Sequence, residues 1–125
     1  MNDLKPENLS QFTGTGNYWR GALGLVYSDG VRYMAEHGGA YWLLDVIASY
    51  QPMLVKHQDE RLHDLQFWTL KVNPDKSAVV TCVADSGEEP VVRQEVPCTD
   101  FPLDTIDIWV GRDVLGMVAY LKSEH

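Results

Sequence analysis

The chain has 125 residues, of which 45% are hydrophobic, and it carries a formal net charge of −8. This length suits one ordinary domain, and a composition with four Trp and six Tyr differs from that of disordered proteins, which have few aromatic residues. The negative charge argues against direct binding to nucleic acid, because phosphate backbones are repelled by an acidic surface.

Targeting signals are not evident at the N-terminus. Met-Asn-Asp-Leu-Lys-Pro-Glu-Asn has no basic stretch followed by an apolar run, and no apolar run approaches the ~20 residues of a membrane span. We therefore expect a cytoplasmic protein that does not associate with a membrane. Cys82 and Cys98 lack C-x-x-C spacing and are expected to remain reduced thiols.

The first third of the chain mixes turn residues with one clear helix start. Residues 1–10 are expected to form a flexible arm, and residues 18–27 an extended or irregular segment interrupted by glycines. Ser28-Asp29-Gly30 is typical of a helix start, because a Ser or Asp side-chain oxygen accepts hydrogen bonds from the first backbone N–H groups. A short helix over residues 31–37 should then end at Gly38-Gly39.

Residues 39–52 predict the central helix of the domain. Apolar side chains cover most of its circumference, while Asp45 and Ser49, four residues apart, form one narrow polar stripe. Pro52 is expected to mark its end, since a proline disfavours helical geometry at the preceding residue. A helix of this kind must be packed on several sides.

The second half of the chain changes to the alternating pattern of strands. After a polar surface loop over residues 53–64, strands are expected at 65–72, 77–84, 91–96 and 105–110, followed by a last apolar segment at 114–121. Helices first and hairpin-connected strands second predict one α+β domain over residues 1–125, with two short N-terminal helices packed on one face of a four- to five-stranded antiparallel sheet.

The aromatic and acidic residues of the second half suggest a protein-binding surface. Residues 85–113 hold eight acidic residues against two arginines, a net charge of −6 that would attract a basic partner surface. Trp109 shares a strand face with Asp107 and is expected to be partly exposed, while isoleucines occupy the other face. The candidate binding residues here are Glu88, Glu89, Asp100, Asp107 and Trp109.

A pocket beside the central helix is the alternative. It would make the protein a small-molecule-binding or hydrolytic domain. Its polar groups would be Arg20, Asp29, Asp45 and Ser49, with Tyr41 and Trp42 as walls. Whether any catalysis occurs stays open, although no catalytic motif is present and a non-enzymatic role is favoured.

No cofactor and no metal site is predicted. His57 and His63 lie six residues apart and match neither a helical pair nor a zinc-finger spacing, so a solvated loop is the better interpretation of this segment. A homodimer formed through an exposed sheet edge also remains open.

Several short motifs are distributed along most of the chain: Gln11-Phe12-Thr13-Gly14-Thr15, Tyr18-Trp19-Arg20, Ser28-Asp29-Gly30, Ala40-Tyr41-Trp42-Leu43-Leu44-Asp45, Ile47-Ala48-Ser49-Tyr50-Gln51, Phe67-Trp68 and Thr99-Asp100-Phe101-Pro102-Leu103. Together they resemble an uncharacterised bacterial family of small proteins of unknown function, found in chromosomes and on mobile elements. The resemblance implies a bacterial, phage or plasmid setting and no particular activity. In that setting, the leading hypothesis is a protein that binds and modulates a host or defence component.

Overall fold

The computed structural model describes residues 4–12 and 16–124. Within them the α-helices are α1 (Pro6–Ser10), α2 (Asp29–Gly38), α3 (Tyr41–Leu54) and α4 (Arg61–Asp64), and the 3-10 turns are η1 (Ala22–Gly24) and η2 (Lys122–Glu124). The strands are β1 (Tyr18–Arg20), β2 (Val26–Ser28), β3 (Leu65–Val72), β4 (Ala78–Val83), β5 (Val92–Val96), β6 (Thr105–Asp113) and β7 (Gly116–Leu121). None of these helices has the length and apolar character to cross a membrane.

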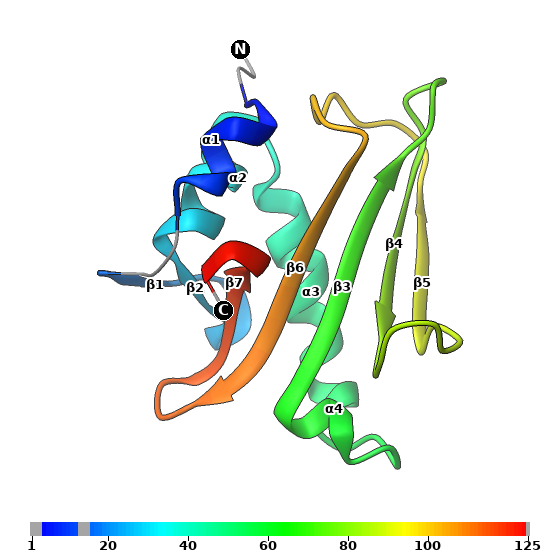
Figure 1. The fold of residues 1–125 in the computed structure, drawn as a ribbon. Coiled ribbons are helices and arrows are strands. Elements are labelled where there is room, and N and C mark those ends of the chain that lie inside the picture. Colours follow the sequence, from blue (N-terminus) through cyan, green and yellow to red (C-terminus); the bar gives the residue numbers. More distant parts are fainter. Residues whose placement is uncertain (1–3, 13–15, 125) are drawn as a thin grey trace.

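These strands form one mixed sheet in the order β1-β2-β7-β6-β3-β4-β5 (Figure 1). All neighbouring strands are antiparallel except β2 and β7, which are parallel. The α+β class is therefore confirmed, but the expected antiparallel sheet of four or five strands is wrong.

The additional strands come from the segments with the weakest strand signal. Residues 18–28, interrupted by Gly21 and Gly24, form the hairpin β1–β2, and the last apolar segment forms β7. The parallel pair joins two strands that are far apart in the sequence. After β2 the chain forms α2 and α3 on one face of the sheet, and it returns to the edge of β2 only with β7, near the C-terminus. Hydrophobic alternation in a three-residue strand is too short to predict such pairing.

The helix boundaries follow local capping, with one exception. Ser28 Oγ accepts a hydrogen bond from Val31 N at 3.2 Å, and Gly39 ends α2 in the left-handed conformation with φ +62°, as predicted. However, α3 continues through Pro52 to Leu54, so the predicted end at Pro52 is wrong. The completely buried Leu54 side chain supplies a reason to continue, because its burial offsets the cost of a proline in the last turn.

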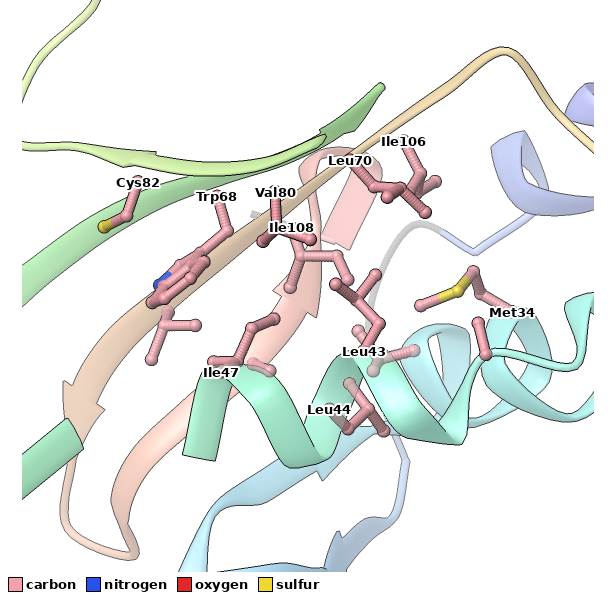
Figure 2. Packing of buried hydrophobic residues seen from close by; sticks show 14 of the residues in the cluster. Met34, Leu43, Leu44, Ile47, Trp68, Leu70, Val80, Cys82, Ile106 and Ile108 are labelled. Atoms are coloured by element: carbon pink, nitrogen blue, oxygen red, sulfur yellow. The ribbon is translucent and has the colours of Figure 1, made fainter. Parts of the chain in front are cut away.

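The core lies between α3, α2 and one face of the sheet (Figure 2). Leu43 and Ile47 of α3 point towards strand residues that alternate inward, and Met34 of α2 closes one end, while Leu44, also buried, lies on the opposite side of α3. The inward strand residues are Trp68, Leu70, Val80, Cys82, Ile106 and Ile108. α3 has only one outward stripe, as its composition predicts, and that stripe carries Asp45 and Ser49.

A buried amide network fixes the base of β3. Gln66 is fully buried, exchanges two side-chain hydrogen bonds of 2.8 and 2.9 Å with Gln51 and accepts one from Trp68 Nε1 at 2.9 Å. Its Nε2 also donates to the carbonyl of Leu62. A satisfied network of this kind specifies one register and one packing arrangement.

The ends of the chain are held by contacts from distant segments. Leu4 and Leu9, on either side of the start of α1, are both buried, and Phe101 packs so closely on Gly38 that a Cβ there would lie 2.7 Å from the ring. Near the C-terminus, the Glu124 carboxylate accepts hydrogen bonds from Ser28 Oγ, Gly30 N and Leu121 N. Within residues 53–64, Leu54 and Leu62 are buried and the remaining residues are exposed or half-buried.

Candidate functional site

The β1–β2 hairpin carries an unusual backbone. Leu23, at its tip, has φ +54° and ψ +22°, and Gly24 follows with φ +81°. A left-handed conformation costs an L-residue about 1–2 kcal/mol, because Cβ approaches the following carbonyl. The turn is closed by Gly21 N donating to Leu25 O at 2.8 Å and by Arg20 Nη1 donating to Gly24 O at 3.2 Å. The local structure therefore holds Leu23 in a conformation that leucine disfavours.

Asp29 attaches this hairpin to the start of α2. Its Oδ2 accepts hydrogen bonds from Gly16 N and Asn17 N at 3.2 and 3.1 Å, and its Oδ1 accepts one from Trp19 Nε1 at 3.1 Å. The guanidinium of Arg32 lies 3.9 Å from the centre of the Trp19 ring, a cation–π contact. The indole is thus held at its edge by Asp29 and on its face by Arg32.

Aromatic side chains of this hairpin lie beside α2 and α3. Trp19 and Tyr27 are cross-strand neighbours, η1 packs beside α3, and Tyr27 interacts electrostatically with Tyr41 at the start of α3. Burial raises the pKa of Tyr27, and the nearby Tyr41 raises it further. The exposed fractions are 74% for Leu23, 42% for Tyr41 and 36% for Trp19. We call Trp19, Leu23, Tyr27 and Tyr41 the hairpin surface.

The structure divides the residues of the expected pocket between the hairpin, the core and the exposed stripe of α3. Arg20 and Asp29 belong to the hairpin's own hydrogen bonding, and Trp42 is half-buried against the core. Asp45 is exposed on α3, and Ser49, also exposed, donates to the carbonyl of Val46 at 2.6 Å. Of the predicted pocket residues, only Arg20, Asp29 and Tyr41 therefore lie at the hairpin, Tyr41 through its interaction with Tyr27.

The acidic residues of the second half do not gather in one place. Because β4 and β5 run in opposite directions, Glu88 and Glu89 lie at one end of the sheet and Asp100 at the other (Figure 1). Glu88 forms two hydrogen bonds with Arg61, at 2.7 and 2.8 Å, and this contact lowers the pKa of the Glu88 carboxyl. The charge of the Glu88–Glu89 end of the predicted acidic segment is thus partly neutralised by Arg61.

Trp109 lies on the sheet face that points away from α3. It is half-buried and contacts Phe67 and Tyr120 edge-on, with ring centroids 5.0 and 6.4 Å apart. On the same face, Asp107 accepts a hydrogen bond from Thr69 Oγ1 at 2.8 Å. Burial raises the pKa of Tyr120. These contacts give the outer face its own small aromatic cluster.

Two open concavities lie away from the central helix. One, of about 560 Å³, lies between α1 and the 102–107 segment, with an apolar lining that includes Pro6, Leu9 and Leu103. The other, of about 410 Å³, lies beside Tyr18 and Tyr120 and has a charged rim that includes Arg112 and Asp113. Neither contains Asp45 or Ser49.

The histidine-containing segment is held by local hydrogen bonds. Asp59 N donates to His57 Nδ1 at 3.0 Å, and His63 Nε2 lies 2.8 Å from the carbonyl of His57. Among the residues whose placement is described, no three His, Cys, Asp or Glu side chains come together in a way that could hold a metal ion.

The sequence did not point to the hairpin surface as a whole. Tyr41 was a candidate pocket wall and Trp19 entered only through the motif Tyr18-Trp19-Arg20, while Leu23 was not singled out. The available signal was the spacing of Gly21 and Gly24 around an apolar residue, which is typical of a tight turn.

Together, the fold and this surface define a small α+β domain with an exposed, rigidly held apolar hairpin. The chain belongs to a family of unknown function, DUF6876, whose model matches residues 3–125. Comparisons with curated proteins and with solved structures found no significant match. Most of the motifs that carry the resemblance lie in the described residues, and one of their side chains, Phe101, packs against Gly38. Thr13-Gly14-Thr15 lies outside the described residues.

Proposed function

We propose that this protein is a non-enzymatic interaction domain that binds a partner protein through the hairpin surface. The observation that supports this most is Leu23, an apolar side chain that is 74% exposed and has a left-handed backbone. Because Leu23 is mostly exposed, it gains little burial energy, while its conformation costs about 1–2 kcal/mol. A strained apolar residue that is mostly exposed in its own fold is a reason to look for a function in binding.

The neighbours of Leu23 suit such a contact. Trp and Tyr are the residue types that most often anchor protein interfaces; Trp19 belongs to the same hairpin, and Tyr41 begins α3, the helix on which η1 packs. The bonds from Asp29 to the 16–19 segment and the Arg32 contact hold Trp19 in place before any partner arrives. Such preorganisation lowers the entropy lost on binding.

Net charge has a separate role in this proposal. A formal charge of −8 attracts a partner with a basic surface and raises the association rate, most strongly at low salt. Because Glu88, Glu89 and Asp100 are split between the sheet ends, the acids act as a long-range field, while the apolar hairpin supplies the short-range contact. Asp107, on the outer sheet face, adds to this field, and Trp109 lies beside it on the same face.

The resemblance to bacterial and mobile-element proteins suggests the kind of partner. We place the protein in the cytoplasm, where it modulates or inhibits a host or defence component. No cofactor is required for this role.

Parallel affinity capture from bacterial lysate tests the proposal. Tagged wild-type protein is compared with Leu23→Asn and with Leu115→Asn, the same substitution at another exposed leucine, on the β6–β7 turn. We expect a protein that is retained by wild type and by Leu115→Asn and lost, by at least about tenfold, with Leu23→Asn, as for the removal of one anchor worth roughly 1.4 kcal/mol. Identical captured proteins for all three baits would refute the role of the hairpin.

A further inference from the structure

β5 forms one end of the sheet, and its outer edge pairs with no other described strand. Pro90 and Pro97 flank the strand and limit it to five residues, Val-Arg-Gln-Glu-Val. An unpaired edge presents a row of backbone N–H and C=O groups to any strand of matching register. The sequence of β5 shows which strand matches.

Two copies of β5 complement each other in one antiparallel register. When Gln94 lies opposite Gln94 of the partner subunit, Arg93 lies opposite Glu95 of the partner subunit, and Val92 lies opposite Val96 of the partner subunit. A slip of two residues in either direction, which keeps each side chain on its face of the sheet, places Arg93 opposite Arg93 of the partner subunit or Glu95 opposite Glu95 of the partner subunit. Opposite charges across a strand pair stabilise it, and like charges destabilise it.

Both charged side chains are exposed, so a second copy of β5 can reach them. Arg93 and Glu95 are 60% and 78% exposed and lie on the sheet face that points away from α3, opposite Thr81 and Val79 of β4. Their own mutual contact is a long one, 3.3 Å. Directly opposite Cβ atoms in an antiparallel pair lie about 4.5–5.5 Å apart, so each charge would gain a neighbour of opposite sign.

We infer that two copies of this chain pair through β5, in an antiparallel and two-fold symmetric arrangement centred on Gln94. The sheet then continues from one subunit into the next. The hairpin β1–β2 is at the far end of the strand order from β5, so the dimer presents its two hairpin surfaces at opposite ends of the joined sheet. This inference does not depend on the proposed function, although two hairpin surfaces would strengthen binding to a partner that is itself multivalent.

A cysteine cross-link tests the register directly. In a Cys98→Ser background, Gln94→Cys places two thiols opposite each other, at a Cα separation of about 4.5–5.5 Å, within the range that a disulfide spans. Val96→Cys in the same background is the matched control, because its two copies would lie about 14 Å apart along the strands. We expect a disulfide dimer, detected on a non-reducing gel after mild oxidation, for Gln94→Cys and not for Val96→Cys. Equal cross-linking of both variants, or of neither, would overturn the inferred register.

A charge exchange tests the pairing without new cysteines. Sedimentation velocity over a concentration series should show wild type approaching twice the 14.1 kDa chain mass. Arg93→Glu and Glu95→Arg should each shift the dimer equilibrium at least about tenfold towards monomer, and the double exchange should restore it, because the opposite charges face each other again. Lys122→Glu, on η2 near the other end of the sheet, is the control for net charge.

Circular dichroism separates loss of pairing from loss of folding in these variants. A wild-type chain that stays monomeric at every concentration, or a double exchange that remains as monomeric as the single variants while folded, would contradict self-pairing through β5. Dimers that persist unchanged in both single variants would assign the contact to another surface and contradict it equally.

Discussion

Replacing Leu23 by Asn should make the fold more stable. Asn tolerates the left-handed conformation that Leu23 adopts at φ +54°, so the substitution removes most of a strain of about 1–2 kcal/mol. Little burial is lost in exchange, since the side chain is 74% exposed. The net expectation is a gain of about 1 kcal/mol in the free energy of unfolding.

The gain can be converted into a melting temperature. With an unfolding entropy of about 2.1 cal/mol/K per residue, 125 residues have about 260 cal/mol/K, so 1 kcal/mol raises Tm by about 4 °C. Thermal and urea unfolding followed by circular dichroism measure both quantities. Leu23→Ala also removes most of the apolar side chain, but Ala lacks the short polar group with which Asn hydrogen-bonds locally in the left-handed conformation, so Tm should stay near that of wild type.

Two results would refute a role for backbone strain at Leu23. A lower Tm for Leu23→Asn would mean that Leu23 stabilises its own fold. An equal rise for Leu23→Ala would mean that exposure, and not backbone strain, sets the effect. Leu115→Asn, at an exposed leucine whose φ is not positive, should change Tm by less than about 2 °C, in keeping with a surface substitution of at most ~0.5 kcal/mol.

Three further predictions concern the buried network, the thiols and the surface ion pairs. Gln66→Ala should destabilise the fold by roughly 2–3 kcal/mol in urea unfolding, because Trp68 Nε1 loses its acceptor in the core; a change below about 0.5 kcal/mol would contradict this. In a native thiol titration at neutral pH, Cys98 should react, while Cys82, whose thiol pKa is raised by burial to about 12, should react only after denaturation; two equally fast thiols would count against the packing of β4. Arg61 lowers the pKa of both its carboxylate partners below their ordinary values of 3.8 and 4.5, so these contacts stabilise the fold above those values and lose their effect as the pH falls through the lowered ones. The stability difference between wild type and Arg61→Met should therefore be present at neutral pH and vanish in acid once both carboxylates are protonated, and a difference that persists there would exclude these carboxylates as its source.

Local signals in the sequence were sufficient for those parts of the fold that depend on near neighbours. Ser28 caps α2 through Val31 N, and Gly39 ends it, because capping involves residues only a few positions apart. The alternation in β6 likewise separates buried Ile106 and Ile108 from the outward Asp107 and Trp109. These features need only the period of a strand and the chemistry of a helix end.

The binding residues predicted from sequence were only partly informative. The eight acidic residues of the 85–113 segment are neighbours along the chain, but reversal of the chain between strands sends Glu88 and Asp100 to opposite ends of the sheet. Asp45 was weighed as a polar group of a pocket, and it is exposed on the outer stripe of α3. Nearness in sequence or a place on one helix does not establish nearness in space.

Composition, the two ends of α2 and the strand period were determined by the sequence itself: an acidic α+β chain with one central apolar helix and strands in its second half. The tertiary structure decided the size of the sheet and the position of the exposed surfaces. β1 and β2 are too short to show a strand period, and they are held by the parallel contact with β7, some ninety residues later in the chain. The exposed and strained Leu23 also depends on the folded hairpin, because its turn is closed by bonds from Gly21 N to Leu25 O and from Arg20 Nη1 to Gly24 O that no periodicity in the sequence encodes.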